Sequence, residues 1–279
     1  MRRRVLAGLL ALTGPLALLT AIVAAPPAAG ADGVTEVCRF DSRFDEISGM
    51  TYSQRHPGIL YLHNDSSGGP RIYAVDARTC RTRATLTLAG AQARDLEAIG
   101  SGRDAKGRPI LWVGDIGDNL DSWPEVRLLR VREPRVLRDQ TLKVRTYRFT
   151  YPGGPQNAEA LLADPRSSRV WVITKKLAHG ALYALPDLRR DRVTVARRVQ
   201  QEGGLVTDAS VSPDGSRYVV RDYVDAQVYA GLPPGQRLGR VYLPFQLQGE
   251  AVTWTSDGSA LLVASERDRR LLRVPVVLR

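Results

Sequence analysis

The chain has 279 residues, with 40 Lys and Arg against 29 Asp and Glu, which gives a formal net charge of +11. Only four of the basic residues are lysines, Lys106, Lys143, Lys175 and Lys176, and the arginines are spread along the whole chain. A nucleic-acid surface gathers its charges on one element. The composition therefore argues against a nucleic-acid partner.

The N-terminal segment has the pattern of an export signal. Arg2, Arg3 and Arg4 precede an apolar run over residues 5–25, and residues 28–31 read AAGA. This order predicts a signal peptide over residues 1–31, cleaved after Ala31. A retained membrane anchor is the alternative, because the apolar run is just long enough to span a bilayer.

Residues 32–279 contain no Pro/Ser linker and no low-complexity tract, so we expect one domain. We expect a monomer in the extracellular space or the cell envelope, which contacts a membrane only through an uncleaved signal segment. Cys38 and Cys80 are the two cysteines. Export favours a disulfide between them, and two free thiols are the alternative.

Five units repeat along the chain. Each starts with a first run that joins an oxygen-bearing residue to small and apolar residues: SGMTYS (48–53), EAIGSG (97–102), EALLAD (159–164), DASVSPDG (208–215) and EAVTWTSDG (250–258). The second runs are residues 59–65, 110–116, 169–175, 216–222 and 260–266. The third runs are residues 71–76, 126–131, 181–186, 226–231 and 270–275.

Four of the units also have a fourth run, such as ATLTLA from Ala84, and turn residues link the runs. Four short strands per unit are typical of β-propeller blades. The last unit has only three, so TEVCRF, from Thr35 to Phe40, is expected to supply its missing strand. We predict an all-β, five-bladed propeller closed by this N-terminal strand. Six blades are the alternative, because the second unit is long; we interpret its extra length as a loop around Asn119 to Glu125.

First strands line the channel of a propeller, so equivalent positions on them converge. The aligned position holds Ser48, Glu97, Glu159, Asp208 and Glu250. Two residues earlier, on the same strand face, lie Glu46, Asp95, Asn157, Val206 and Gln248. Converging carboxylates raise one another's pKa or bind a cation. A ring of oxygen ligands favours Ca²⁺ over Mg²⁺, so we predict a calcium site at the five ring residues. Hydrated or arginine-paired carboxylates are the alternative.

The ends of the second strands should surround the same channel mouth, because an antiparallel hairpin returns to the face where it began. These ends carry His63, Asn64, Asp65, Asp115, Thr174, Lys175, Arg221, Asp222, Ser265 and Glu266. This mixture of acids and bases beside a cation predicts a site for an anionic ligand. Candidate catalytic residues are Asp115, Asp222, Lys175, Arg221 and His63. Solvated loop charges, and a hydrogen-bonding role for His63, are the alternatives.

The stretch LWVGDIGDNLDSW, residues 111–123, combines a strand with turn residues and possible metal ligands. The repeat places Asp115 at the channel mouth. Asp118, Asn119 and Asp121 are interpreted as loop structure.

The stretches EISGMTY, LYLHNDS, IYAVD and GEAVTWTSDG resemble the SdiA-regulated family of bacterial extracytoplasmic β-propellers and its esterase-like phytase relatives. The Ser48, Glu97, Glu159, Asp208 and Glu250 ring is similar to the central calcium site of the five-bladed calcium-activated nucleotidases, the apyrases. The resemblance implies the propeller fold and a channel cation. This sequence departs from the nucleotidase pattern at Asp208, where a nucleotidase-like site accepts a residue with a hydroxyl group.

Two functions follow as hypotheses. The first is a secreted propeller that binds a small anionic ligand or an envelope component, with a channel cation and no catalysis. The alternative is a calcium-dependent hydrolase of phosphate or other anionic esters, in which Asp115 or Asp222 activates water and Lys175 and Arg221 neutralise charge. No G-x-S-x-G motif supports a serine hydrolase.

Overall fold

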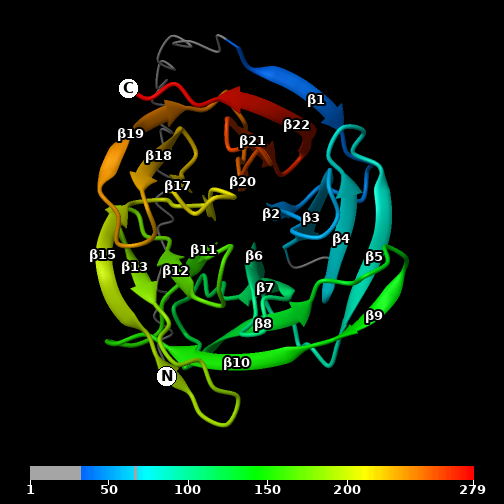
Figure 1. The fold of residues 1–279 in the computed structure, drawn as a ribbon. Helices are drawn as coiled ribbons and strands as arrows, with labels where there is room; N and C mark the ends of the chain where they lie inside the picture. The colour runs from blue at the N-terminus through cyan, green and yellow to red at the C-terminus, as the bar shows by residue number, and fades with distance from the viewer. Residues whose placement is uncertain (1–32, 66–67) are drawn as a thin grey trace, which may run out of the picture.

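The computed structural model describes residues 33–65 and 68–279, and every regular element in these ranges is a β-strand. The predicted signal segment lies outside the described residues. Within the described part of the chain, no helix is long and apolar enough to cross a membrane. Five sheets surround one axis, and adjacent sheets follow one another along the chain (Figure 1).

Blades 1 and 2 each have four antiparallel strands and one added outer strand. Blade 1 consists of β2 (Ile47–Tyr52), β3 (Ile59–Asn64), β4 (Arg71–Asp76) and β5 (Thr82–Ala89), with β9 (Gln140–Lys143) parallel to β5. Blade 2 consists of β6 (Leu96–Arg103), β7 (Pro109–Asp115), β8 (Val126–Arg132) and β10 (Arg145–Thr150), with β14 (Thr194–Val195) parallel to β10.

Blades 3 and 4 have four strands each. Blade 3 consists of β11 (Ala158–Ala163), β12 (Val170–Thr174), β13 (His179–Ala184) and β15 (Arg197–Gly203). Blade 4 consists of β16 (Asp208–Val211), β17 (Arg217–Arg221), β18 (Asp225–Ala230) and β19 (Arg237–Tyr242).

Blade 5 closes the ring as the sequence predicted. It contains β20 (Ala251–Trp254), β21 (Ala260–Ser265) and β22 (Asp268–Pro275), and its fourth strand is β1 (Thr35–Arg39). β1 pairs with β22 in the antiparallel direction, and Thr35 lies opposite Arg273. The five-bladed fold is therefore confirmed, and the six-bladed alternative is wrong.

The extra length of the second unit has two parts. One is the loop between β7 and β8, which includes the predicted Asn119 to Glu125 segment. The other part follows β8 and contains β9. This strand pairs with β5 of blade 1, and Leu86 lies opposite Gln140. Part of the insertion therefore extends the neighbouring blade rather than forming a loop.

The core is divided among the five interfaces between adjacent blades. Alternation along β3 shows why: Leu60 and Leu62 pack toward blade 5, whereas Tyr61 packs toward blade 2. Equivalent apolar clusters fill the interfaces between blades 2 and 3, 3 and 4, and 4 and 5. Both faces of the inner strands are therefore buried, which explains their near-continuous apolar sequence.

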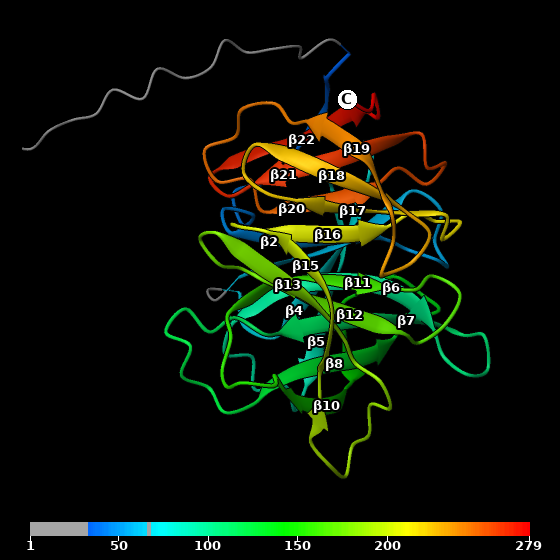
Figure 2. The same cartoon turned by 90° about the vertical axis from the view of Figure 1, so that its left-hand side faces the viewer.

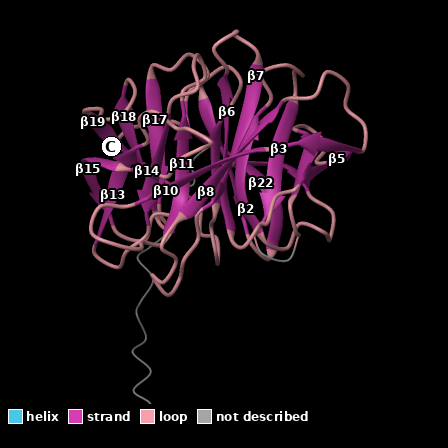
Figure 3. Ribbon diagram, turned by 90° about the horizontal axis from the view of Figure 1, so that it is seen from below, coloured by secondary structure: helices cyan, strands magenta, loops and turns pink. Residues whose placement is uncertain are grey.

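The first strands contact one another in a closed ring, in the order β2, β6, β11, β16, β20 and back to β2. Side views show strands running between two opposite faces, with the loops at either end (Figures 2 and 3). We call the end where the first strands begin the channel mouth and the opposite end the channel base.

A disulfide joins Cys38 and Cys80, as predicted. Cys38 lies on β1 of blade 5, and Cys80 lies in the turn between β4 and β5 of blade 1. The bond therefore connects the blades on either side of the closure point.

Replacing both cysteines with serine should lower the free energy of unfolding by up to about 4 kcal/mol, the chain-entropy value for a loop of this length. Urea unfolding of the two proteins measures the difference. An unchanged free energy of unfolding would show that the β1–β22 pairing closes the ring without help from the disulfide.

Candidate cation site at the channel mouth

The predicted ring residues all lie at the channel mouth, and all are buried: Ser48, Glu97, Glu159, Asp208 and Glu250. On three of the first strands the ladder register shifts at the ring position, between Ile47 and Gly49, Leu96 and Ala98, and Ala158 and Ala160. A β-bulge re-aims the side chain of the extra residue. The bulges therefore set the directions of Ser48, Glu97 and Glu159.

Three carboxylates form the tightest acidic cluster at the mouth. Ligand oxygens of Asp65, Asp95 and Glu97 all lie within 4.8 Å of one another. Asp65 follows β3 of blade 1, whereas Asp95 and Glu97 come from the start of blade 2. Only glycine fits beside them at position 117, because a Cβ there would lie 2.3 Å from Asp95 Oδ2 and 2.6 Å from Glu97 Oε1. The β7–β8 loop thus packs its backbone against the cluster.

The three carboxyl groups are electrostatically unfavourable as anions. Burial, followed by the nearby carboxylates, raises the pKa of Asp65 to about 8. Burial is also the main cause that raises the pKa of Asp95. For Glu97, burial and then the nearby charges of Glu159 and Asp65 raise the pKa well above its usual range. Asp65 Oδ1 is buried and has no hydrogen-bond partner among the described residues. A cation would relieve this repulsion and occupy the open coordination position.

The other side of the mouth contains a lysine among acids. Lys175 Nζ lies 3.3 Å from Glu159 Oε2 and 5.3 Å from the centre of the Tyr223 ring. Burial opposes the charge of Lys175, but Glu159 and Glu250 raise its pKa. The Tyr223 hydroxyl donates to Glu250 Oε1 at 3.2 Å. Lys175 therefore neutralises part of the ring and holds Glu159.

Glu250 keeps one free oxygen in this arrangement. Its Oε2 is buried and lacks a partner among the described residues. Burial raises the pKa of Glu250 to about 7, against the lowering effect of Lys175. Glu250 is therefore a second candidate ligand with an uncommitted buried oxygen.

Ser48 and Asp208 have protein partners. Ser48 Oγ donates to Glu97 Oε2 at 2.9 Å, so it orients the carboxylate of the acidic cluster. Asp208 accepts from the Ala209 amide at 2.8 Å and from the Val252 amide at 2.7 Å. Since the Val252 bond crosses from blade 4 to blade 5, Asp208 joins two first strands. Its role as a metal ligand stays a prediction.

The residues two positions before the ring have different roles. Asn157 Nδ2 donates to Glu159 Oε1 at 3.2 Å, and its Oδ1 accepts from the Asp118 amide at 2.8 Å. Asp95 belongs to the acidic cluster. Val206 packs in the apolar interface between blades 3 and 4. The backbones of Glu46 and Gln248 accept from the amides of Asp65 and Glu266, respectively. The last two backbone contacts hold the ends of β3 and β21 at the mouth.

Two of the candidate catalytic acids hold backbone segments. Asp115 Oδ1 accepts from the amides of Arg94 and Asp95 at 2.8 and 3.0 Å, and so fixes the entry to β6. Asp222 Oδ1 accepts from the amides of Val224 and Asp225 at 2.7 and 2.8 Å, and so closes the turn between β17 and β18.

Arg221 is fully buried between blades 4 and 5. Its Nη1 donates to the carbonyls of Ala251 and Ala264 at 2.7 and 3.1 Å, and its Nη2 donates to Gln246 Oε1 at 2.8 Å. A Cβ at Gly249 would lie 1.7 Å from Nη2, so the glycine before Glu250 makes room for the guanidinium. Arg221 thus supports the strand that carries Glu250, and a direct role toward a ligand stays a prediction.

His63 is also fully buried. Its Nδ1 lies 3.0 Å from the Asn64 carbonyl oxygen, and its Nε2 has no hydrogen-bond partner among the described residues. Burial lowers its pKa to about 4. The imidazole is therefore neutral near pH 7. Its role as a catalytic base stays a prediction.

The Asp118 to Trp123 segment has the expected loop structure. Asp118 accepts from the amides of Ser122 and Trp123, and Asp121 accepts from Lys176 Nζ at 2.6 Å. Arg94 stacks on the Trp123 ring at 4.2 Å from its centre. These contacts fasten the β7–β8 loop beside the acidic cluster.

The sequence pattern missed two residues of this site, Tyr223 and Gly117, and the part that Asp65 plays in it. Asp65 was expected at the mouth but not as part of the tightest cluster, because it lies outside the repeated position. Tyr223 and Gly117 lie in loops that follow second strands, where the repeat has no common residue. The Gly117 between two aspartates was the visible signal for close backbone approach.

No family model matches the chain, and no curated protein matches it in sequence. Among solved structures it is similar to the PQQ-bound form of an aldose sugar dehydrogenase from Streptomyces coelicolor, with 13% identity and a TM-score of 0.49. The match covers 90% of this chain and 99% of that one. None of the families that the motifs resemble is identified by these comparisons.

The acidic cluster predicts a pH-dependent stability. The pKa of Asp65 is 3.8 in a model compound and about 8 in the fold, so protonation favours the folded state. This stabilisation is complete below about pH 4 and is lost as the pH rises through about 8. In EDTA, the melting temperature should fall across this range, and Asp65→Asn should flatten the profile. Parallel profiles for the two proteins would contradict the assigned cause.

Proposed function

We propose that this chain is an extracytoplasmic β-propeller that holds a hard cation, calcium, at the channel mouth and binds a small anionic ligand beside it. The observation that carries the proposal is the convergence of Asp65, Asp95 and Glu97, with oxygens within 4.8 Å and raised pKa values. Carboxylate oxygens are the ligands of hard cations, and a flexible set from two blades suits Ca²⁺ better than the strict octahedron of Mg²⁺.

Further oxygens support the fit to a cation of high coordination number. Glu250 Oε2 is buried and unpartnered among the described residues. Ser48 orients Glu97, and Asn157 orients Glu159, so the ligands are held by a surrounding set of hydrogen bonds. In this proposal Asp65, Asp95 and Glu97 hold the ion, with Glu159 and Glu250 on the opposite side.

Export is supported by the disulfide, because disulfides persist in oxidising compartments. The signal-like pattern of residues 1–31 points the same way. The ligand is then an envelope component or an extracellular molecule.

Exposed apolar side chains on the loops around the mouth favour a ligand with an apolar part. Leu120, Leu177 and Phe245 are 86%, 88% and 87% exposed. They lie between β7 and β8, between β12 and β13, and between β19 and β20. Loops that join a second strand to a third strand, or a fourth strand to the first strand of the next blade, lie at the mouth. The first two of these three loops are joined by the contact of Asp121 with Lys176. Apolar groups gathered around a charged site are typical of binding surfaces.

Glu97→Gln should weaken calcium binding by about thirtyfold or more, since removing one buried charge partner costs about 2–5 kcal/mol. Isothermal titration of the purified protein with CaCl₂ measures this change. Glu202→Gln is the matched control: Glu202 is also buried, but it lies on the outermost strand of blade 3, where it accepts from Tyr229 and Gln200. Equal calcium affinity in wild type and Glu97→Gln would refute the proposed site.

Calcium-dependent ester hydrolysis is the second candidate function. Lys175 favours it, because its ammonium is held beside the acidic mouth, where it would face an anionic ester. A bound cation would polarise such an ester and lower the pKa of a bound water.

A panel of phosphate and carboxylic esters, assayed with calcium and with EDTA, separates the two functions. We expect ligand binding without calcium-dependent turnover. Turnover that EDTA abolishes and that Lys175→Met reduces would instead establish the hydrolase.

A further inference from the structure

The channel base contains a cavity of about 310 Å³ to which all five blades contribute. Its lining includes Tyr52, Ser101, Arg166, Pro213 and Trp254, one residue from each blade. Tyr52 and Trp254 are the last residues of their first strands, whereas the acidic cluster lies where first strands begin. The cavity is therefore separate from the proposed cation site.

The charge of the cavity lining is opposite to that of the mouth. Arg103 and Arg166 line it, and no acidic side chain of residues 33–65 and 68–279 does. The guanidinium of Arg166 makes no hydrogen bond to the part of the chain that the structure describes, and its Nε lies 3.7 Å from Asp164 Oδ1. Arg103 uses Nη1 for the Gly107 carbonyl, at 2.9 Å. Both arginines keep free donors for an anion.

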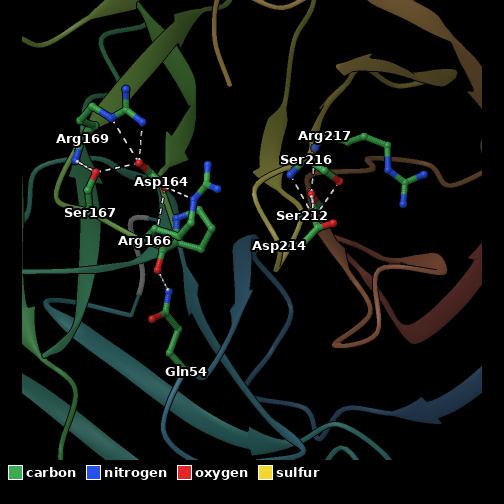
Figure 4. Close-up of polar contacts among 10 residues, drawn as sticks. Gln54, Asp164, Arg166, Ser167, Arg169, Ser212, Asp214, Ser216 and Arg217 are labelled. Atoms are coloured by element: carbon green, nitrogen blue, oxygen red, sulfur yellow. Dashed lines mark hydrogen bonds and ion pairs between the residues drawn. The ribbon is translucent and has the colours of Figure 1, made fainter. Parts of the chain in front are cut away.

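The nearby carboxylates are already paired. Asp164 accepts from Arg169 Nη2 at 2.8 Å and from the Ser167 hydroxyl at 2.7 Å, as Figure 4 shows. Asp214, also in Figure 4, accepts from the hydroxyls of Ser212 and Ser216 in its own turn. These contacts leave the arginines of the lining without full neutralisation.

Uncharged polar groups complete the lining. Gln54 Nε2 donates to the Pro165 carbonyl at 2.9 Å, and its Oε1 is buried without a partner among the described residues. Ser101 donates to the Tyr52 carbonyl at 2.6 Å, so the contact of Thr51 with Ser101 leaves lone pairs free on Thr51. These groups offer acceptors as well as donors, which a ligand with several hydroxyl groups satisfies.

The size of the cavity limits the ligand further. A cavity of this volume is at the lower end of small-molecule sites, which span about 300–1,000 Å³. Trp254 is buried in the wall of the cavity, where Arg217 stacks on its ring at 4.6 Å, so the indole closes the cavity and offers almost no open face. A single hydroxylated ring with one anionic group matches these features.

We propose that the channel base binds an acidic monosaccharide, a sugar ring that carries one carboxylate or phosphate. Arg103 and Arg166 bind the anionic group, and Gln54 and Thr51 bind ring hydroxyls. The site is independent of the cation at the mouth.

Isothermal titration of the purified protein with glucuronate, glucose 6-phosphate and neutral glucose tests the proposal. At least one of the two anions should bind at least about tenfold more tightly than glucose, since hydrogen bonds to charged groups contribute about 1.5–3 kcal/mol. The preferred anion identifies the acidic group. Binding of glucose with equal affinity, or no binding of either anion, would overturn the proposal.

Arg166→Gln should weaken binding of the preferred anion about tenfold or more. Arg197→Gln is the matched control, because it removes the same charge from an exposed position on β15 of the same blade. Equal losses in the two variants would indicate a general charge effect and contradict the site. Melting curves verify that both variants are folded.

Two further measurements place the ligand. Glu97→Gln should leave binding of the anion unchanged, and a parallel loss would move binding to the mouth and refute the inference. Inorganic phosphate should bind more weakly than the preferred acidic sugar, because it lacks the ring hydroxyls. Equal affinity for phosphate would overturn the assignment of a sugar.

Discussion

The pairing of β1 with β22 is the interaction on which the rest of the structure depends. It closes a ring in which each first strand contacts the next, and the disulfide between Cys38 and Cys80 fastens the same junction. The first strands remain the inner edges of five separate sheets, and closure packs these edges against one another around the channel. Closure also forces residues at equivalent positions of five separate units into one small volume.

That convergence explains the electrostatics of the mouth. Glu97, Glu159 and Glu250 occupy repeated positions, so closure brings their charges together regardless of the repulsion between them. Lys175 compensates on one side, while Asp65, Asp95 and Glu97 remain a group of acids with raised pKa values on the other. A structure that retains such a cluster is stabilised by any cation that binds it.

The two ends of the channel differ although the same five strands build both. At the mouth, bulges in β2, β6 and β11 turn polar side chains inward. At the base, the strands end in turns whose carboxylates are paired locally, and Arg103 and Arg166 face the cavity. Blade 4 departs from the pattern, because Asp208 and Arg221 bond to the backbone of blade 5 and strengthen the interface between blades.

The sequence by itself determined the number of blades, the closing strand, the disulfide and the residues at the start of each first strand. These features follow from the order of strands along the chain and from the two-residue period within each strand. Only the tertiary structure decided which carboxylates meet, that Asp65 joins Asp95 and Glu97, that Asp208 and Arg221 have backbone partners, and that a basic cavity lies at the base. The reason is physical: these contacts join residues on different blades, and their geometry depends on bulges, loop paths and side-chain directions that no repeated pattern encodes.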